Sequence, residues 1–519
     1  MRRHLRSRAI AWLPPLGILA LLAVALACAG EDRRDAAAPS PATEGRHSAL
    51  WGKDGEAWSA SGRLPDFSHA GYGGGAPIPE VPVAANVTDF GAVGDGVTDD
   101  SEAFLTALAS MDKGALLIPP GRYRLTRVLE LDRSGLVLRG AGPGETVLFF
   151  PRPLFDALGK GPFGGPFGWA WGGGWIWARG ELPEEPELAE ITRPARRGDY
   201  SLAVSTTDGL EPGRMVRLSQ QEIDGSLTLH LHNDQPLGGR CWVDRPGFRV
   251  IDWAVEISRV ERGRVYFDRP LRVDVRPDWS AALLPYHPTV SDVGVEGLTI
   301  EFPPTEYNGH HQEPGYNAIY FERVHDSWVR DVAIRDFDTA VSFWGARYAT
   351  ASGLRLYGRG GHYGLNLGAS QDCVMTDFTI ENVSEHDLSV SNLANGNVFS
   401  NGRGLDVNFD HHRGAAYENL FSNIDVRASW RRGRLWDSSG TPSGHYTAAR
   451  ETFWNIRPRV STKWIPAWPQ LTIVGPVREK EAVAEPLDDL WVEPLNRVEP
   501  PELHAAQRRR AAAAKGPDR

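Results

Sequence analysis

Cysteine is scarce in this sequence, with three among 519 residues. Apart from Cys28, only Cys241 and Cys373 remain, so they can form at most one disulfide. Their spacing matches no cysteine ligand pair of a structural zinc site. The sequence therefore predicts neither a redox centre nor a metal site built on cysteine.

Long apolar runs are also scarce, and the one at residues 9–27 follows four arginines and ends just before Cys28. Basic residues, an apolar stretch and a small-residue end are typical of a cleaved export signal. Two consecutive prolines at 14–15 disfavour a membrane-spanning helix. Residues 1–28 are therefore predicted to be a signal peptide.

The last signal residues, Ala25-Leu26-Ala27-Cys28, resemble the lipobox of bacterial lipoproteins, although that motif usually has its Leu one position earlier. The resemblance implies a lipid on Cys28, with plain cleavage after Ala27 as the alternative. Since Ala29 rather than Asp follows, we expect an outer-membrane lipoprotein. Without the lipid, the periplasm or the extracellular space is expected, and membrane contact is expected only through that lipid.

Positive charge is in deficit. Without the four leader arginines, 52 basic residues face 66 acidic ones, a formal charge of −14. An acidic surface argues against nucleic acid as a partner. Glycine, proline and tryptophan are abundant instead, at 56, 38 and 18 residues, which indicates many turns and exposed aromatic rings.

A turn-rich motif follows the small, polar stretch that opens the mature chain. It runs from Val87 to Ser101 as Val-Thr-Asp-Phe-Gly-Ala-Val-Gly-Asp-Gly-Val-Thr-Asp-Asp-Ser, and an apolar helix is predicted after it to about Ser110. Glycines permit its tight turns, and its Asp and Ser side chains can cap the helix. Short strands broken by Gly and Pro come next, at 115–123 and 136–142.

These motifs resemble the N-terminal part of the pectate-lyase-superfamily β-helices, which polygalacturonases, many polysaccharide lyases and phage tailspikes share. The resemblance implies an all-β, right-handed parallel β-helix, in which the helix caps the solenoid and Pro-Pro-Gly-x-Tyr forms the first coil. It implies a polysaccharide as the partner and leaves the oligomeric state open. Because the motif is specific for fold rather than reaction, Asp95, Asp99 and Asp100 are expected to be structural.

The coil pattern lapses between residues 155 and 286, where hairpin-like stretches predict an inserted β-rich domain. Four tryptophans at its start, Trp169, Trp171, Trp175 and Trp177, either stack on sugar rings or form a packing seam. The predicted organisation is a signal peptide at 1–28, a tether and N-terminal arm at 29–80, cap and first coils at 81–154, the insert at 155–286, the main coils at 287–475 and a C-terminal tail at 476–519. From about Glu499 this tail is charged and Ala-rich and is expected to be frayed.

After the insert the repeat can be counted. Ile334, Leu356 and Ile380 are 22 and 24 residues apart, and Val374, Val398 and Leu420 are 24 and 22 apart. A period in the low twenties indicates one coil per repeat, so residues one period apart become neighbours about 4.8 Å apart on one face.

Chemically versatile residues recur at this period. His362 to His386 is 24 residues, His386 to His411 is 25, and Asp387 to Asp410 is 23. Converging imidazoles, carboxylates and a guanidinium indicate an active site, although polar ladders also stabilise β-helices. The predicted catalytic residues are His362, His386, Asp387, Asp410, His411, His412 and Arg413. The predicted substrate-binding residues are Tyr363, Asn366, Asn408, Trp344, His445 and Arg450.

The runs His-Tyr-Gly, His-Asp-Leu, Asp-His-His-Arg and Phe-Trp-Asn resemble a less characterised bacterial branch of the same superfamily, over roughly residues 50–458. The chain lacks a clear counterpart of the polygalacturonase set of paired aspartates, Gly-His-Gly and Arg-Ile-Lys. Simple hydrolysis of polygalacturonate is therefore disfavoured.

Three functions remain open. A lyase would cleave uronic-acid polysaccharides by β-elimination, with His411 or His412 as base, Arg413 on the substrate carboxylate, and Tyr363 or His362 as acid. No cofactor is required, although Asp387 and Asp410 offer oxygen ligands for Ca²⁺. A glycoside hydrolase would instead use Asp387 with Asp410 or Asp406. A glycan-binding solenoid without turnover is the third reading.

Overall fold

The computed structural model describes residues 45–235, 242–412, 414–427, 435–438, 448–459, 464–465, 468–476, 482–483 and 489–515. All of them belong to one compact unit, Pro41–Arg519. Cys28, Cys241, Arg413 and His445, which carry predictions made above, lie outside the described residues. Within the described ranges, no helix is both long and apolar enough to cross a membrane.

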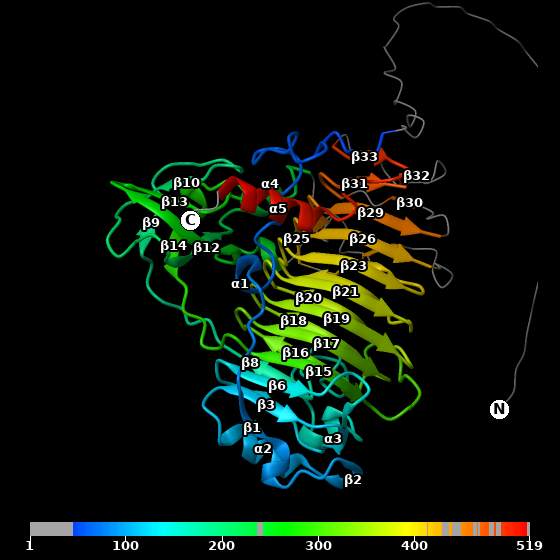
Figure 1. The fold of residues 1–519 in the computed structure, drawn as a ribbon. Coiled ribbons are helices and arrows are strands. Elements are labelled where there is room, and N and C mark those ends of the chain that lie inside the picture. Colours follow the sequence, from blue (N-terminus) through cyan, green and yellow to red (C-terminus); the bar gives the residue numbers. More distant parts are fainter. Residues whose placement is uncertain are drawn as a thin grey trace, which may run out of the picture. The chain divides into compact units, whose positions relative to one another are not determined.

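Two parallel sheets form the stacked coils (Figure 1). The longer sheet contains β1 (Val83–Asn86), β2 (Asp95–Asp99), β3 (Gly114–Ile118), β4 (Gly121–Arg124), β6 (Leu136–Gly140), β7 (Thr146–Phe149), β15 (Gly294–Glu301), β17 (Trp328–Arg335), β19 (Thr350–Tyr357), β21 (Val374–Ile380), β23 (Val398–Gly404), β26 (Leu420–Val426), β29 (Thr452–Pro458), β31 (Thr472–Gly475) and β33 (Trp491–Pro494). The shorter sheet contains β5 (Leu129–Leu131), β8 (Ile176–Arg179), β16 (Asn317–Glu322), β18 (Thr339–Trp344), β20 (Tyr363–Gly368), β22 (His386–Ser391), β24 (Phe409–His411) and β27 (Trp436–Ser438).

The strand register of these sheets agrees with the repeat spacing counted in the sequence, because residues one repeat apart are paired in adjacent strands. Ile334 pairs with Leu356, and Leu356 with Ile380, in three successive strands. Val374 likewise pairs with Val398, and Val398 with Leu420. The predicted right-handed parallel β-helix is confirmed.

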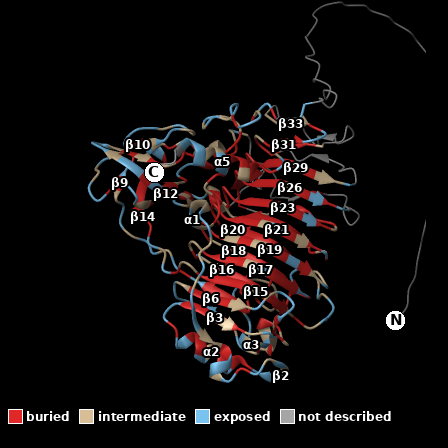
Figure 2. Ribbon diagram, viewed as in Figure 1, coloured by how far each residue is buried: buried red, intermediate tan, exposed pale blue. Residues whose placement is uncertain are grey.

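Most strand residues of the coils are buried (Figure 2), and their apolar side chains form one large hydrophobic cluster. Phe399, Phe421 and Phe453 stack with ring centroids 5.1 and 5.0 Å apart, close to the spacing of adjacent strands. Asn397 donates from its side-chain amide to Asn419 at 2.9 Å one coil further on. Such ladders satisfy buried polar groups and hold the coils in register.

The turn-rich motif before the first coils is structural, as predicted. The Asp100 carboxylate accepts from the main-chain N–H groups of Val93 and Gly94 at 2.7 and 3.2 Å. Asp95 accepts from Val97 and Thr98 in the same way. The short helices of the described chain are α1 (Tyr72–Gly75), α2 (Ser101–Ala109), α3 (Leu154–Leu158), α4 (Ser226–Leu231) and the 3₁₀ turns η1 (Val87–Phe90), η2 (Trp242–Asp244) and η3 (Pro277–Trp279).

The insert contains a six-stranded antiparallel sheet in the order β10-β13-β12-β11-β14-β9. Its strands are β9 (Ala189–Glu190), β10 (Ser201–Ala203), β11 (Met215–Gln221), β12 (Arg249–Glu261), β13 (Arg264–Phe267) and β14 (Ala282–Pro285). The predicted start at residue 155 lies too early, because β8 still belongs to the shorter sheet of the coils. The tryptophans there are mainly a packing seam: Trp169, Trp175 and Trp177 are buried, and Trp171 is 47% exposed.

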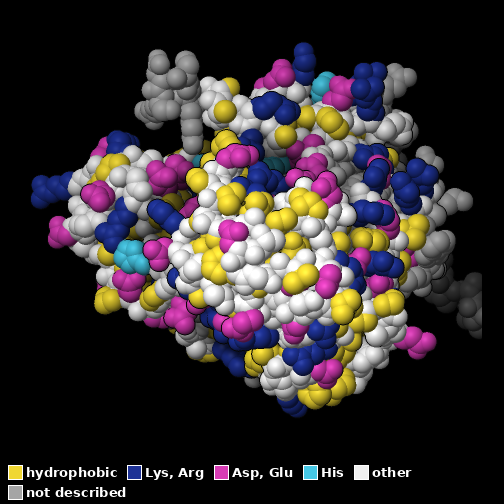
Figure 3. All heavy atoms as spheres, turned by 60° about the horizontal axis from the view of Figure 1, so that its bottom comes forward, with side chains coloured by type: hydrophobic (Ala, Val, Ile, Leu, Met, Phe, Trp, Pro, Cys, Tyr) yellow, Lys and Arg dark blue, Asp and Glu magenta, His cyan; other side chains and the backbone are white. Residues whose placement is uncertain are grey.

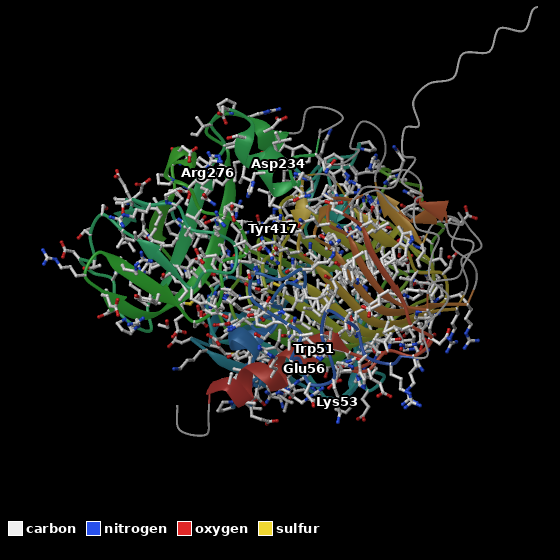
Figure 4. All side chains as sticks on the ribbon, turned by 90° about the horizontal axis from the view of Figure 1, so that it is seen from above. Trp51, Lys53, Glu56, Asp234, Arg276 and Tyr417 are labelled. Atoms are coloured by element: carbon white, nitrogen blue, oxygen red, sulfur yellow. The ribbon has the colours of Figure 1, made fainter. Side chains whose placement is uncertain are left out.

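The insert packs against the turns of the coils, where Tyr417 lies between the two in the view along the coil axis (Figure 4). Two insert arginines, Arg269 and Arg272, form ion pairs with the fully buried Asp372 of a coil turn. Arg272 also donates to Asn395 at 3.0 Å. Buried charges require such pairing, so this contact fixes the insert on the coils.

The N-terminal arm and the C-terminal segment pack together along the outside of the longer sheet. Trp51 and Phe67 share an apolar cluster with Leu503 of α5 (Leu503–Lys515). Gln507 donates to the carbonyl of Pro65 at 2.8 Å. The prediction of a frayed end from about Glu499 is wrong for its described part, because α5 packs against the longer sheet. Earlier in the predicted tail, β33 continues that sheet.

Exposed charges pair between neighbouring coils. Arg355 donates to Glu381 at 3.0 Å, and Arg457 donates to Asp425 at 2.7 Å. On the face seen in Figure 3, basic and acidic side chains lie interspersed among hydrophobic ones. Such exposed pairs contribute about 0–1 kcal/mol each, so the buried ladders stabilise the coils more.

Candidate functional site

Five of the predicted site residues lie together at the shorter sheet, on three successive coils: His362, Tyr363, His386, Asp410 and His412. The rings of His362 and Tyr363 stack with centroids 4.2 Å apart. Those of His386 and His412 are 4.9 Å apart. The one-coil spacing of the sequence thus brings these groups to one place.

Asp410 is the centre of this group. Its Oδ2 lies 3.3 Å from Nδ1 of His386 and 3.3 Å from Nδ1 of His412, and it accepts from the Ser389 hydroxyl at 2.7 Å. Burial alone would raise the pKa of Asp410, but the imidazoles of His386 and His412 outweigh it and hold the pKa well below its usual range. Asp410 therefore stays ionised and orients both rings.

A polar row across the coils holds Asp410 in place. Asn366 pairs with Ser389, and Ser389 with Asp410, in adjacent strands. Asn366 also donates to the Ser342 hydroxyl at 2.9 Å one coil earlier. Asn366, predicted to bind substrate, is buried in this row, so its observed contacts are supporting ones.

A loop outside the repeat completes the site. Residues 302–316, here the histidine loop, bring Nε2 of His310 to 3.2 Å from Nε2 of His362. Glu313 of the same loop is buried, and its Oε1 lies 3.3 Å from Nδ1 of His362. The name histidine cluster is used below for His310, His362, His386 and His412.

Hydrogen bonds hold the histidine loop at its C-terminal end and beside His310. The buried Asp338 carboxylate accepts from the main-chain N–H groups of Gly315 and Tyr316 at 3.2 and 2.8 Å. Glu313 accepts from the Tyr307 hydroxyl at 2.5 Å. His310 and Glu313 were missed because they follow no coil spacing. The sequence did carry a signal, a second His-His pair at 310–311.

Two imidazoles of the cluster, those of His310 and His362, are held in their neutral form. Burial, with the neighbouring His362 ring next in importance, lowers the pKa of His310 to about 4. Burial and the neighbouring His386 ring lower the pKa of His362 well below its usual range. Neutral imidazoles present lone pairs, which suits them as bases or as metal ligands.

His411 does not belong to the cluster, and the prediction that it is a catalytic residue is wrong. Side chains alternate along a strand, so Asp410 and His412 face outward while His411 faces the interior. His411 is fully buried, with its ring centroid 4.1 Å from that of Trp468. Its Nε2 lies 3.5 Å from the buried Glu451 carboxylate.

Three more predicted residues have structural contacts. The Asp387 carboxylate accepts from the main-chain N–H groups of Ser384 and Asn408 at 3.0 and 3.2 Å. Asn408 accepts from the Asp387 N–H at 2.8 Å in return. Arg450 donates to Glu418 at 2.8 Å and to a carbonyl of the insert. Asp387 and Asn408 clamp a turn, and Arg450 joins the insert to the coils, away from the cluster.

Trp344 lines a cavity of about 320 Å³ between the coils and the insert, together with Trp242, Arg249 and Asn392. It is the last residue of β18, whereas His362 and His386 lie at the starts of β20 and β22. On the histidine-loop side, the exposed Trp171 ring lies 5.7 Å from that of His311. Aromatic rings therefore flank the shorter sheet at both strand ends.

Two groups in this site have donor atoms close enough for one metal ion: His310 with His362 and His386, and His386 with Asp410 and His412. The pair of carboxylates predicted to bind Ca²⁺ is unsuited, because Asp387 accepts from the main-chain N–H of Ser384 whereas Asp410 contacts the His386 ring. Imidazole nitrogens favour ions such as Zn²⁺ over Ca²⁺, which prefers oxygen ligands. The second group also resembles a base network, a carboxylate that orients imidazoles.

Known proteins match the chain mainly in short segments. Alginate lyase 7 of Azotobacter vinelandii is 28% identical over 188 residues, which are 34% of this chain and 16% of that protein. Mannuronan C5-epimerase AlgE6 of the same organism is 42% identical over 72 residues, 12% of this chain and 8% of that protein. The chain therefore spans less than a fifth of the length of these relatives.

A solved structure, the tailspike protein gp49 of Pseudomonas phage LKA1, aligns with a TM-score of 0.47 at 14% identity, covering 75% of this chain and 70% of that one. The family model described as "Rhamnogalacturonase A/epimerase, pectate lyase-like" matches residues 84–150. That segment holds the turn-rich motif, α2 and the first coils. Together with the parallel coils, it identifies the chain as a pectate-lyase-like β-helix protein.

Proposed function

We propose that this protein is an enzyme that cleaves a uronic-acid polysaccharide by β-elimination. The observation that carries the proposal is the buried Asp410 carboxylate between His386 and His412, beside Tyr363. The relatives named above as an alginate lyase and a mannuronan epimerase support a polysaccharide as substrate. A carboxylate that orients imidazoles is a suitable base for a weakly acidic proton.

His412 is the proposed base. Its Nδ1 faces Asp410, which leaves the other ring nitrogen for the substrate, and its side chain is 21% exposed. His412 takes the proton from the sugar carbon beside the carboxylate. The bond to the glycosidic oxygen then breaks, a carbon–carbon double bond forms, and the leaving oxygen receives a proton.

Tyr363 is the proposed acid for the leaving oxygen. Its ring lies beside those of His362 and His386, with centroids 4.2 and 5.1 Å away. A phenol in this position can donate its proton as the bond to the leaving oxygen breaks. The exposed Trp171 offers an apolar face for a neighbouring sugar ring.

Hydrolysis by paired carboxylates is less well supported. That reaction needs two carboxyl groups about 5–9 Å apart across the scissile bond. Asp387 and Asp410 are both fully buried, Asp387 accepts from main-chain amides, and Oδ2 of Asp410 accepts from Ser389. Neither carboxylate is exposed to a sugar on the surface of the coils.

Epimerisation is the second candidate, because several relatives are named mannuronan C5-epimerases. It shares the proton abstraction with β-elimination and differs only afterwards, when the carbanion is protonated on the opposite face. The same base would serve both reactions. The fate of the leaving oxygen is what separates them.

The test uses a panel of uronic-acid polysaccharides and the purified protein. β-Elimination predicts ultraviolet absorbance from unsaturated uronates together with new reducing ends. Epimerisation predicts a changed uronate signal in NMR spectra without chain cleavage, and hydrolysis predicts reducing ends without absorbance. Binding with none of these changes would indicate a glycan-binding solenoid and would overturn the enzymatic proposal.

We also propose that the protein is exported and anchored by a lipid on Cys28. The support is the arginine-led apolar run and the Ala-Leu-Ala-Cys end in the sequence. Mass spectrometry of the mature N-terminus should find a lipidated cysteine. An unmodified N-terminus, or Cys28→Ser protein that still fractionates with membranes, would refute the anchor.

A further inference from the structure

We propose that His310, His362 and His386 bind one divalent transition-metal ion, with Zn²⁺ as the ion to test first. One donor nitrogen from each of the three rings lies within 4.8 Å of the others. The three residues come from the histidine loop, the residue before β20 and the first residue of β22. The coil repeat brings His362 and His386 together, but His310 follows no repeat, so the histidine loop completes this site.

The closest pair already has the spacing of two ligands. Nε2 of His310 and Nε2 of His362 are 3.2 Å apart. Two nitrogens at 2.0–2.1 Å from a tetrahedral Zn²⁺ are separated by about 3.3 Å. His386 offers the third nitrogen within 4.8 Å of the other two, and its ring centroid is 5.4 Å from that of His310.

Buried carboxylates stand behind two of the three rings. Oε1 of Glu313 is 3.3 Å from Nδ1 of His362, and Oδ2 of Asp410 is 3.3 Å from Nδ1 of His386. Metal-binding histidines commonly donate their other N–H to a carboxylate, which fixes the ring and the tautomer. This arrangement turns the remaining nitrogen of each ring toward the proposed ion.

The ligand set also selects the kind of metal. Three imidazoles without a carboxylate oxygen favour a borderline ion such as Zn²⁺, whereas Ca²⁺ takes six to eight oxygen ligands. The alternative group of His386, Asp410 and His412 is less suited, since Asp410 already holds both Nδ1 atoms and the Ser389 hydroxyl. That group remains as the base network.

A three-histidine site leaves the fourth tetrahedral position for a water or a substrate oxygen. His310 is exposed, so the ion can be reached from the histidine-loop side. If the proposed β-elimination is right, the ion would neutralise the uronate carboxylate while His412 removes the proton. This role rests on the proposed function, but binding of the ion does not.

The test measures metal binding by the full chain itself. Protein stripped with a chelator is titrated with Zn²⁺ by calorimetry, and Co²⁺ is used as a spectroscopic probe for nitrogen ligation. We expect one ion per chain and visible Co²⁺ absorption typical of a tetrahedral site. Loss of a histidine ligand should weaken binding by at least about 100-fold, more than a supporting carboxylate typically does.

His310→Ala is the sharpest variant, because this exposed loop residue can be removed without opening the core. Glu313→Gln should weaken binding by about 10–100-fold, as expected for a supporting carboxylate. His311→Asn is the matched control, since it removes the next imidazole and Asn tolerates the positive φ of 65° there. The control should bind the ion as the unaltered chain does.

The proposal is overturned if the stripped chain binds no Zn²⁺ or Co²⁺, or if His310→Ala and His362→Gln both bind as well as the control. Circular dichroism of each variant shows whether it is folded. Ion binding without turnover on any polysaccharide would refute the proposed function alone. Turnover that persists in stripped protein lacking any bound ion would refute the role of the ion in the reaction and leave its binding untouched.

Discussion

Asp372 and Asp410 are both fully buried aspartates between two nitrogen-bearing side chains, yet they differ in the partners they hold. Asp372 is bracketed by the guanidiniums of Arg269 and Arg272. Asp410 is bracketed by the imidazoles of His386 and His412. Guanidiniums keep their charge at every accessible pH, whereas imidazoles exchange protons near neutrality.

The difference lies also in what each aspartate joins. Asp372 links a coil turn to the insert, and its partners come from segments about 100 residues earlier in the chain. Asp410 links successive coils at the outer face of the shorter sheet. A permanent ion pair suits a fixed domain contact, and an exchangeable one suits proton transfer. We therefore assign stability to the first and chemistry to the second.

Replacement of Asp410 by Asn should have the largest effect. The amide keeps the size of the side chain but no longer stabilises an imidazolium at His412. General-base catalysis is worth about 10²–10⁴-fold, so turnover should fall by that order. Kinetics on the best polysaccharide, together with the melting temperature, test this.

Asp372→Asn is the control for that experiment. It should leave the turnover of the folded enzyme unchanged, since Asp372 is remote from the cluster in the hydrogen-bond network. If both aspartate variants lose turnover equally, the division between stability and chemistry fails.

Removal of Asp372 should give the second largest effect, on stability. Asp372→Ala leaves Arg269 and Arg272 buried without their carboxylate, and breaking a buried pair costs about 3–5 kcal/mol. The free energy of unfolding, measured with urea, should drop by this amount. Arg355→Ala, which breaks an exposed pair with Glu381, should change it by about 0–1 kcal/mol. Equal losses in the two variants would contradict the prediction.

The coil register could be predicted from the sequence because apolar residues recur at a constant period. Ile334, Leu356 and Ile380 are interior positions of successive coils, and burial keeps their spacing regular. The insert boundary was less predictable. Residues 155–180 contain many glycines and tryptophans, and little in the pattern separates a coil bulge from a new domain.

The site was predictable only where it follows the coils. His362, His386 and Asp410 were found by the period, but His310 and Glu313 come from a loop, whose path depends on tertiary contacts such as Asp338 with Tyr316. The orientation of His411 and His412 could have been deduced from strand alternation. Adjacent residues of a strand face opposite sides of the sheet, so only one of His411 and His412 can face the histidine cluster.

The pH dependence of stability should show a smaller effect that is specific to Asp372. Although burial opposes it, Arg269 and Arg272 lower the pKa of Asp372 from 3.8 to about 2. A lowered pKa means that the stabilisation is complete above about pH 4 and is lost as the pH falls toward 2. The shift corresponds to about 2 kcal/mol.

The measurement is the free energy of unfolding of the unaltered chain and of Asp372→Asn between pH 6 and pH 2. The gap between the two proteins should narrow by about 2 kcal/mol as the pH falls through that window. The difference is used because other carboxylates titrate in both proteins alike. A gap that stays constant with pH would show that Asp372 is not held ionised by its arginines.

The smallest predicted effect concerns His411, which also pairs with a buried carboxylate but faces the interior. Phe421, Phe453 and Trp468 surround its ring, so Phe should fit in His411→Phe. Glu451 keeps the amide of Asn419 at 3.0 Å, and burial raises its pKa, so it can remain as a neutral acid. We expect a loss of about 1 kcal/mol in unfolding free energy and little change in turnover.

His412→Phe, one residue further on, should instead lower turnover by about 10²–10⁴-fold with a small change in stability. Both variants remove an imidazole next to a buried carboxylate and differ only in the side of the strand that the imidazole faces. Kinetics and urea unfolding of the two variants therefore show whether that side decides the loss of turnover. Equal loss of turnover in the two variants would mean that the carboxylate–imidazole pair matters wherever it lies, and the assignment of His412 as the base would then have no support.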